Sequence, residues 1–291
     1  MMEQLFIICM RKELQKKVER AIKLLQAAGK IAQEHGQPLE VAYSGGKDSD
    51  VILQLTRMAG VEYRAIYKNT TIDPPQTIRH AKEMGAEMMR PTKTFRELIA
   101  IHGFPSRVRR LCCSYLKEYK VLDYCVIGVR QEESKKRAER YKEPEVCRVY
   151  SKKEKVRQYL PILDWTSEDI SEFVSERGIK CHPLYYDEQG NFHPERRLGC
   201  MCCPLMSKRL RLREFEQYPK MIKFYIFGGL KYLETHPNAK IKTYFHNVYE
   251  WLTFDLFCDS LVEFRERFGA NLFDDGIDCK EFLENYFHVE L

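Results

Sequence analysis

Long apolar segments are missing from this sequence, and no run approaches the ~18 residues that a membrane-spanning helix needs. We therefore expect no membrane partner. The short apolar patch from Leu5 to Met10 has no small-residue cleavage site after it, so we also expect no signal peptide. A strong charge imbalance is missing too, since 48 Lys and Arg face 42 Asp and Glu, for a net charge of +6. That excess suits an anionic substrate but does not by itself indicate DNA binding.

Without an export signal, we expect a cytoplasmic protein whose 11 cysteines are reduced. In a reducing compartment, metal or redox chemistry explains so many thiols better than structural disulfides do. The 291 residues suffice for one large domain, or for one domain with a smaller helical region.

The most informative stretch is the loop Tyr43-Ser44-Gly45-Gly46-Lys47-Asp48-Ser49. It follows a short apolar run, Leu39 to Ala42, that is typical of a buried strand, and it precedes helical apolar spacing from Asp50. A loop of this kind directs backbone N–H groups and the positive end of a helix dipole at one point, where an anion is stabilised. The spacing is not that of a Walker loop.

Strand and helix patterns alternate after this loop, which predicts a mostly parallel, doubly wound α/β sheet. A helix is expected over Lys12 to Glu34, from its apolar spacing. Further strands are expected near 62–67, 86–89 and 123–130. The stretch from Tyr141 to Arg157 is strongly charged and has little periodicity, and we expect it to be a mobile surface excursion.

The loop resembles the PP-loop of the N-type ATP pyrophosphatases and of the phosphoadenosine phosphosulfate (PAPS) reductase family. Four further segments match that family in order, from Asn69–Asp73 to Arg197–Pro204. The resemblance implies an adenine nucleotide alpha hydrolase-like fold and an enzyme acting on ATP or an adenylyl sulfonucleotide. It also implies nucleotide-binding residues, which are Ser44, Gly45, Gly46, Lys47, Asp48, Ser49, Asp73, Arg130 and Arg137. Of these, Lys47, Asp48 and Arg130 are the candidate catalytic residues.

Cysteine spacing indicates a metal site. Cys112 and Cys113 are adjacent, Cys200 and Cys203 form a C-x-x-C, and together they supply the four thiolates that an iron–sulfur cluster or a structural zinc requires. The resemblance to cluster-bearing adenylyl-sulfate reductases favours a [4Fe–4S] cluster, with zinc as the alternative. Cys202 interrupts the C-x-x-C and could replace one of its neighbours as a ligand.

The chain lacks the C-terminal Glu-Cys-Gly-x-His tail that carries the nucleophilic cysteine of thioredoxin-linked family members. The favoured hypothesis is therefore ATP-dependent adenylation of an acceptor, with pyrophosphate release and a cluster that aids sulfur transfer. The alternatives are reduction of a sulfonucleotide, or a non-catalytic nucleotide- or nucleic-acid-binding module with a structural metal. The acceptor would be a nucleic acid or a small molecule, and a protein would donate sulfur or electrons.

Three regions are expected along the chain. Residues 1–38 form a helical lead-in, 39–206 form the PP-loop domain with its cysteines, and 207–291 form a helical appendage. Aromatic and basic residues of this appendage suit either single-stranded nucleic acid or a hydrophobic core, and we expect a core.

Overall fold

The computed structural model describes residues 10–150, 154–269 and 276–291. The apolar patch before Met10 lies outside these ranges. The chain forms two compact units, an α/β unit and a helical unit, and each is built from several segments. The α/β unit contains residues 1–69, 74–90 and 118–198, and the helical unit contains residues 70–73, 91–117 and 199–291.

The α/β unit is built on a six-stranded sheet in the order β3-β2-β1-β4-β6-β5. Every neighbouring pair is parallel except β5 and β6, which are antiparallel. This mostly parallel sheet with its helices confirms the predicted fold class. The strands are β1 (Leu39–Tyr43), β2 (Tyr63–Lys68), β3 (Glu87–Met89), β4 (Tyr124–Val126), β5 (Glu145–Val149) and β6 (Lys155–Tyr159).

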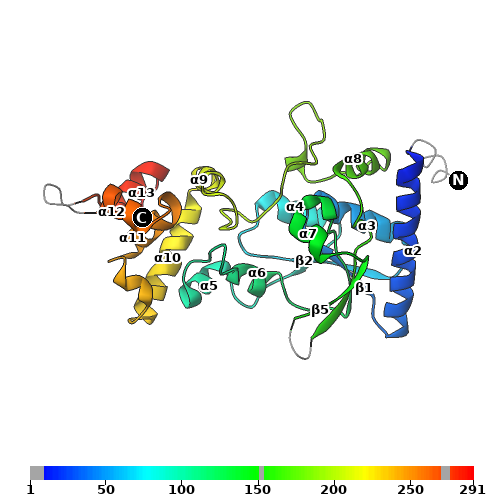
Figure 1. Ribbon diagram of the computed structural model, residues 1–291, viewed down its shortest axis with the longest axis horizontal. Coiled ribbons are helices and arrows are strands. Elements are labelled where there is room, and N and C mark those ends of the chain that lie inside the picture. Colours follow the sequence, from blue (N-terminus) through cyan, green and yellow to red (C-terminus); the bar gives the residue numbers. More distant parts are fainter. Residues whose placement is uncertain (1–9, 151–153, 270–275) are drawn as a thin grey trace. The chain divides into compact units, whose positions relative to one another are not determined.

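Most helices of the α/β unit pack beside the sheet through a buried face at helical spacing. They are α2 (Lys12–Glu34), α3 (Lys47–Ala59), α4 (Pro75–Glu83), α7 (Lys135–Arg140) and α8 (Ser167–Glu176). Helix α2 has the predicted bounds. It packs along α3, which in turn contacts α8 (Figure 1). Side chains from all three helices join those of β1 in one hydrophobic core.

The expected lack of periodicity from Tyr141 to Arg157 was wrong. This stretch contributes β5 and the first part of β6, which pair as a hairpin at the edge of the sheet. Side chains of β5 alternate between half-buried and exposed positions, and the inward set includes Val146 and Arg148. Alternation of inward and outward side chains in a highly charged segment is typical of an edge strand. The many charges hid this alternation in the sequence.

The helical unit has an interior dominated by aromatic rings, as expected for the C-terminal aromatics. Its helices are α5 (Phe95–His102), α6 (Leu111–Leu116), α9 (Lys208–Gln217), α10 (Lys220–Thr235), α11 (Val248–Phe257), α12 (Leu261–Phe268) and α13 (Cys279–Phe287). Helix α10 packs against α5 and α11. The approach to α5 is so close that a Cβ at Gly228 would lie 2.7 Å from the side chain of Ile99.

No helix within the described ranges combines the length and the apolar character that crossing a bilayer requires.

Candidate functional site

The loop from Ser44 to Ser49 lies where the sheet topology favours a ligand. Strand β1 is central, with β2 on one side and β4 on the other, so the strand order reverses at β1. In open α/β sheets, ligands bind beyond the carboxyl end of a strand at this reversal. The loop follows β1 directly and leads into α3 at Lys47.

Glycine is required at Gly45 for two reasons. Its φ of +76° is a left-handed conformation, and an added Cβ would lie 2.8 Å from Cγ2 of Thr77. Gly46 is the N-cap of α3 and provides no side-chain acceptor. The Ser49 hydroxyl turns back to donate to the Gly46 carbonyl at 2.6 Å. The Gly46 N-cap therefore makes no side-chain hydrogen bond to the first amides of α3, and the amides of a helix N-terminus stabilise an anion.

Three predicted catalytic residues come together beside this loop. Lys47 Nζ lies 2.9 Å from one carboxylate oxygen of Asp48, and Arg130 Nε lies 2.8 Å from the other. Lys47 and Arg130 are only 6% and 3% exposed. Residues 47 and 130 are far apart in sequence, and they meet because β1 and β4 are adjacent parallel strands whose carboxyl ends share one edge.

Arg130 is fixed by several partners. Its Nη1 donates to Glu132 at 2.6 Å and to the Trp165 carbonyl at 3.3 Å. Glu132 also accepts from Ser167 Oγ at 3.0 Å, which links the loop after β4 to the start of α8. A guanidinium held this firmly presents its remaining N–H groups in one direction, which suits phosphate or sulfate oxygens.

Arg137 lies in α7 and pairs with Glu133 one turn earlier. Burial lowers the pKa of its guanidinium, while the nearby Asp48 opposes the shift and Arg197 and Arg130 add to it. Arg130 and Arg137 therefore provide two cations near Asp48, and Arg197 lies close to Arg137. Ser134 accepts a hydrogen bond from the Arg137 amide and serves as the N-cap of α7.

Sequence reasoning missed Tyr185, which lies next to the loop. Lys47 Nζ is 5.4 Å from the centroid of its ring, and a Cβ on Gly46 would be 3.3 Å from its hydroxyl oxygen. Burial raises the pKa of Tyr185 to about 12, so the phenol stays protonated and can donate a hydrogen bond. The only sequence signal was its place in the run Pro183-Leu184-Tyr185-Tyr186.

A buried polar network under the loop was also missed. Asp50, in the first turn of α3, accepts hydrogen bonds from the Tyr43 hydroxyl and from His80 Nε2, the latter at 3.0 Å. Asp50 is fully buried, and burial raises the pKa of its carboxyl despite these donors. His182 lies edge-on to His80 and 3.3 Å from Thr77 Oγ1, and Thr77 supports Gly45. The network therefore connects the base of α3 to the loop.

Asp73 belongs to the helical unit, together with all four predicted cysteine ligands. Its carboxylate accepts from the Thr70 amide at 2.8 Å and closes a short turn. The carbonyl of Ile72 within this turn accepts from the Met201 amide at 2.8 Å. The segment of Asp73 is thus joined to the loop that carries Cys200 and Cys203.

The four cysteines act on one another electrostatically. The pKa of Cys112 is raised by its hydrogen bond with Cys113 and by burial, and the nearby Cys203 and Cys200 raise it further. The hydrogen bond from Cys112, and then Arg110 and Lys117, lower the pKa of Cys113 to about 6. Thiolates beside cations are the donor form that metals bind.

Cys202 has a different environment from its neighbours. It is fully buried in the aromatic core, with a φ of +53°, and its amide donates to Glu214 at 2.6 Å. Its carbonyl accepts from Arg211 and Tyr225, both at 3.3 Å. These backbone bonds hold Cys202 in a buried turn. Cys200 and Cys203, in contrast, are only partly buried.

Within the described residues, no group of three or more His, Cys, Asp or Glu side chains is already arranged to hold a metal ion. The four-thiol donor set nevertheless fits an iron–sulfur cluster in chemistry, with cations close by and the intervening Cys202 turned into the core.

Comparison with known proteins identifies the family. The phosphoadenosine phosphosulfate reductase domain matches residues 38–206, more than half of the chain. An uncharacterized protein of Methanocaldococcus jannaschii is 24% identical over 73% of this chain and 53% of its own length. The chain spans about half the length of several relatives that it matches.

Some of the matched relatives have named activities. Sulfate adenylyltransferase subunit 2 of Shewanella frigidimarina is 26% identical over 56% of this chain and 64% of that protein. The phosphoadenosine 5'-phosphosulfate reductase of Vibrio campbellii is 32% identical over 24% of this chain and 26% of that protein. With the family domain spanning the Ser44–Ser49 loop, the Arg130 segment and all four cysteines, this chain belongs to the phosphoadenosine phosphosulfate reductase domain family.

Proposed function

We propose that this protein is a cytoplasmic enzyme that binds ATP at the Ser44–Ser49 loop and adenylates an acceptor with release of pyrophosphate. The observation that carries the proposal is the Lys47–Asp48–Arg130 constellation beside the start of α3, whose N-cap is a glycine. Helix amides, a lysine and fixed arginines provide the donors that a triphosphate needs at its anionic oxygens.

In the proposed reaction, an acceptor atom forms a bond to the α-phosphorus of ATP. The bond from that phosphorus to the bridging oxygen breaks, and pyrophosphate leaves with the electron pair. Lys47 and the α3 amides would stabilise charge on the leaving pyrophosphate, and Arg130 and Arg137 would hold the α-phosphate. Asp48 would position both Lys47 and Arg130. Catalysis would rest on orientation and on charge stabilisation.

The second reading is reduction of an adenylyl sulfonucleotide, and it is supported by the named Vibrio relative and by the low pKa of the Cys113 thiol. It requires a thiolate that attacks sulfur, and our proposal assigns Cys113 to a metal instead. The third reading is a nucleotide-binding module without turnover. All three predict that the loop binds an adenine nucleotide, so the test must separate binding from chemistry.

Exchange of radiolabelled pyrophosphate into ATP, measured beside calorimetric binding of ATP and of adenylyl sulfate, separates these readings. The adenylation proposal predicts ATP binding and exchange in the presence of the acceptor, with binding weakened and exchange lost in Lys47→Ala. Losing a charge-assisted hydrogen bond should weaken binding about tenfold or more. Lys16→Ala, which removes an exposed lysine of α2, is the matched control. Tight binding of adenylyl sulfate but not ATP would favour the reductase, and unchanged ATP affinity in Lys47→Ala would refute the loop assignment.

We further propose that Cys112, Cys113, Cys200 and Cys203 ligate a [4Fe–4S] cluster. When bound, it would supply iron–sulfur redox chemistry and a fixed local charge. The protein would contribute cations at its edge, including Arg110 and Lys117, which already favour the thiolate form of Cys113.

Iron and zinc analysis of anaerobically purified protein tests this ligand set. About four irons per chain are expected, with most of the iron lost when any one of the four cysteines becomes serine. Cys202→Ser is the internal control and should retain iron, because the buried Cys202 makes its bonds through its backbone. One zinc per chain would show that the four cysteines hold zinc and not a cluster. Retention of iron in Cys113→Ser together with loss in Cys202→Ser would overturn the ligand assignment.

A further inference from the structure

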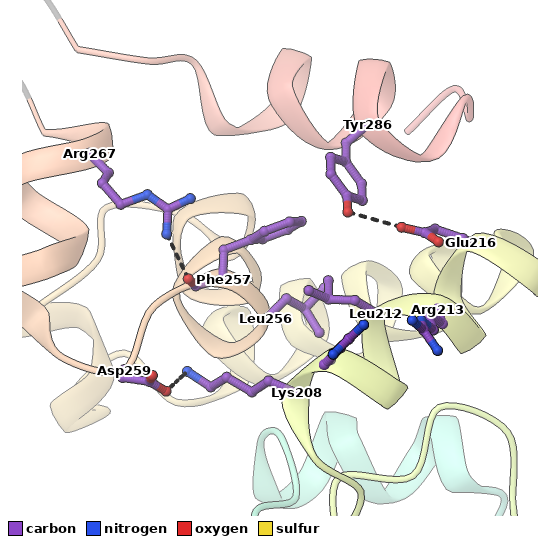
Figure 2. Close-up of a pocket in the computed structure, with 10 residues that line it drawn as sticks. Lys208, Leu212, Arg213, Glu216, Leu256, Phe257, Asp259, Arg267 and Tyr286 are labelled. Carbon is purple, nitrogen blue, oxygen red and sulfur yellow. Dashed lines mark hydrogen bonds and ion pairs between the residues drawn. The ribbon is translucent and has the colours of Figure 1, made fainter.

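A second cationic site lies in the helical unit, beyond the residues that the family domain covers. A pocket of about 510 Å³ is bounded by α9, the end of α11 and α13 (Figure 2). This volume is within the range of ~300–1,000 Å³ that is usual for small-molecule sites. Four cationic and two acidic side chains line the pocket, so its lining has two net positive charges.

The cationic side chains that line the pocket differ in whether they have ion-pair or hydrogen-bond partners. Lys208 Nζ pairs with Asp259 at 2.7 Å, and Arg267 pairs with Glu263 at 2.9 Å while also donating to the Phe257 carbonyl. Arg209 and Arg213 are exposed, and in the part of the chain that the structure describes neither has an ion-pair or hydrogen-bond partner.

These two arginines lie one turn apart on α9, at positions i and i+4. Like charges at this spacing destabilise a helix by a few tenths of a kcal/mol, so folding alone gives no reason to place them together. Two guanidinium groups on one helix face can instead share the oxygens of a phosphate. The unpaired cations therefore indicate an anionic ligand.

An aromatic wall completes the pocket. Tyr286 is 39% exposed, and its hydroxyl donates to Glu216 at 3.0 Å. The rings of Phe257 and Phe287 contact the Tyr286 ring edge to face, with centroids 4.9 and 4.8 Å away. A ring fixed in this way loses little conformational entropy when a planar group stacks on its open side. Leu212 and Leu256 add apolar surface.

We propose that this pocket binds one nucleotide, whose phosphate is held by Arg209 and Arg213 and whose base stacks on Tyr286. Both a free mononucleotide and a nucleotide within single-stranded RNA have this chemistry. Phosphate neutralisation by arginine and base stacking on aromatic rings are the two contributions on which single-strand recognition depends. The proposal does not depend on the Ser44–Ser49 loop.

Fluorescence polarisation with labelled GMP and with a labelled single-stranded RNA of about 12 nucleotides tests the pocket and its source of ligand. GMP is chosen because the loop is expected to take an adenine nucleotide. We expect R209A/R213A to weaken binding at least tenfold. For the RNA, the slope of log affinity against log salt should fall by about 0.7, because the one phosphate contact that the two arginines share is lost. Binding of RNA alone identifies a strand as the source, and binding of GMP identifies the free nucleotide.

The control K223A/R265A removes the same charge from two exposed cations that do not line the pocket. Alanine favours helix, and both variants should fold normally. Tyr286→Ala should weaken binding fivefold or more, and Tyr286→Phe should restore it because the ring is kept. Equal losses in the two charge variants, full binding by R209A/R213A, or no binding of either probe by the wild-type chain would each overturn the proposal.

Discussion

The two units of the chain bury different kinds of side chain. In the α/β unit, ionisable side chains are sealed inside and bonded to one another, as Asp50, His80 and Tyr43 are beneath the loop. In the helical unit, the interior consists mainly of aromatic rings that contact Tyr225 edge to face, with the buried Arg211 paired to Asp255 among them. The first arrangement fixes polar groups before a ligand arrives. The second builds a scaffold whose chemistry lies at its margins, in thiols and unpaired arginines.

The two tryptophans make this comparison measurable, because Trp165 lies in the α/β unit and Trp251 in the helical unit. In a Trp251→Phe background, fluorescence reports unfolding of the α/β unit. In a Trp165→Phe background, it reports the helical unit. Each prediction below uses the background that matches its unit.

The largest expected effect is that of Asp50→Ala. Removing the carboxylate leaves the Tyr43 hydroxyl and the His80 ring buried without an acceptor, so the free energy of unfolding should fall by about 3–5 kcal/mol. Urea unfolding followed through Trp165 measures this loss. Asp50→Asn keeps one acceptor and should lose less. A loss below about 1 kcal/mol in Asp50→Ala would mean that the network does not organise the unit.

Much of the fold could be predicted because its elements have simple periodicity. Helix α2 and the strand before the loop follow from apolar spacing alone, and the loop of Ser44 to Ser49 has a recognisable composition. The meeting of Lys47, Asp48 and Arg130 follows from strand adjacency, once a parallel sheet is assumed.

The remainder depends on contacts that no local pattern encodes. Asp50 is polar at a position where the helix faces the core, and only the tertiary placement of His80 and Tyr43 explains it. The association of residues 70–73 and 91–117 with the C-terminal helices is likewise a long-range packing event. The hairpin of β5 and β6 was missed because its charges resemble those of a solvated loop.

A somewhat smaller effect is expected from acid on the α/β unit. Burial, and then the nearby His80, lower the pKa of His182 from 6.5 to about 4. The unfolded chain therefore binds more protons than the folded chain between these values, so stability falls as the pH drops from about 6.5 to about 4. The loss should reach about 3 kcal/mol at the lower limit.

Urea unfolding followed by Trp165 fluorescence at several pH values in this range measures how the free energy of unfolding depends on pH. His182→Asn keeps an acceptor for the Leu184 amide and should flatten the curve. Both fully buried histidines among the described residues, His80 and His182, belong to the α/β unit, so the Trp251 transition should depend less on pH. An equal acid slope in both transitions would remove the contrast between the units.

Gly228→Ala tests the helical unit through packing alone. The added Cβ would lie 2.7 Å from Ile99 and 3.1 Å from the Arg96 carbonyl, so α10 and α5 must separate. Overpacking of this kind should cost about 1–3 kcal/mol in the Trp251 transition, with no change in its pH dependence. A second substitution, Ile99→Ala, makes room for the methyl group, and the double variant should be less destabilised than the two single effects added together.

The smallest effect is expected at the exposed edge of the α/β unit, where charge is not buried. Arg64 of β2 makes a two-point ion pair with Glu87 of β3, at 2.9 and 2.7 Å, but the side chains are 42% and 47% exposed. Solvent screening should limit the cost of Arg64→Ala to less than about 1 kcal/mol in the Trp165 transition. Raising the salt concentration should shrink the difference further, and a double-mutant cycle with Glu87→Ala isolates the pair. A loss of unfolding free energy as large as that of Asp50→Ala would contradict the idea that burial determines how strongly charged contacts stabilise this unit.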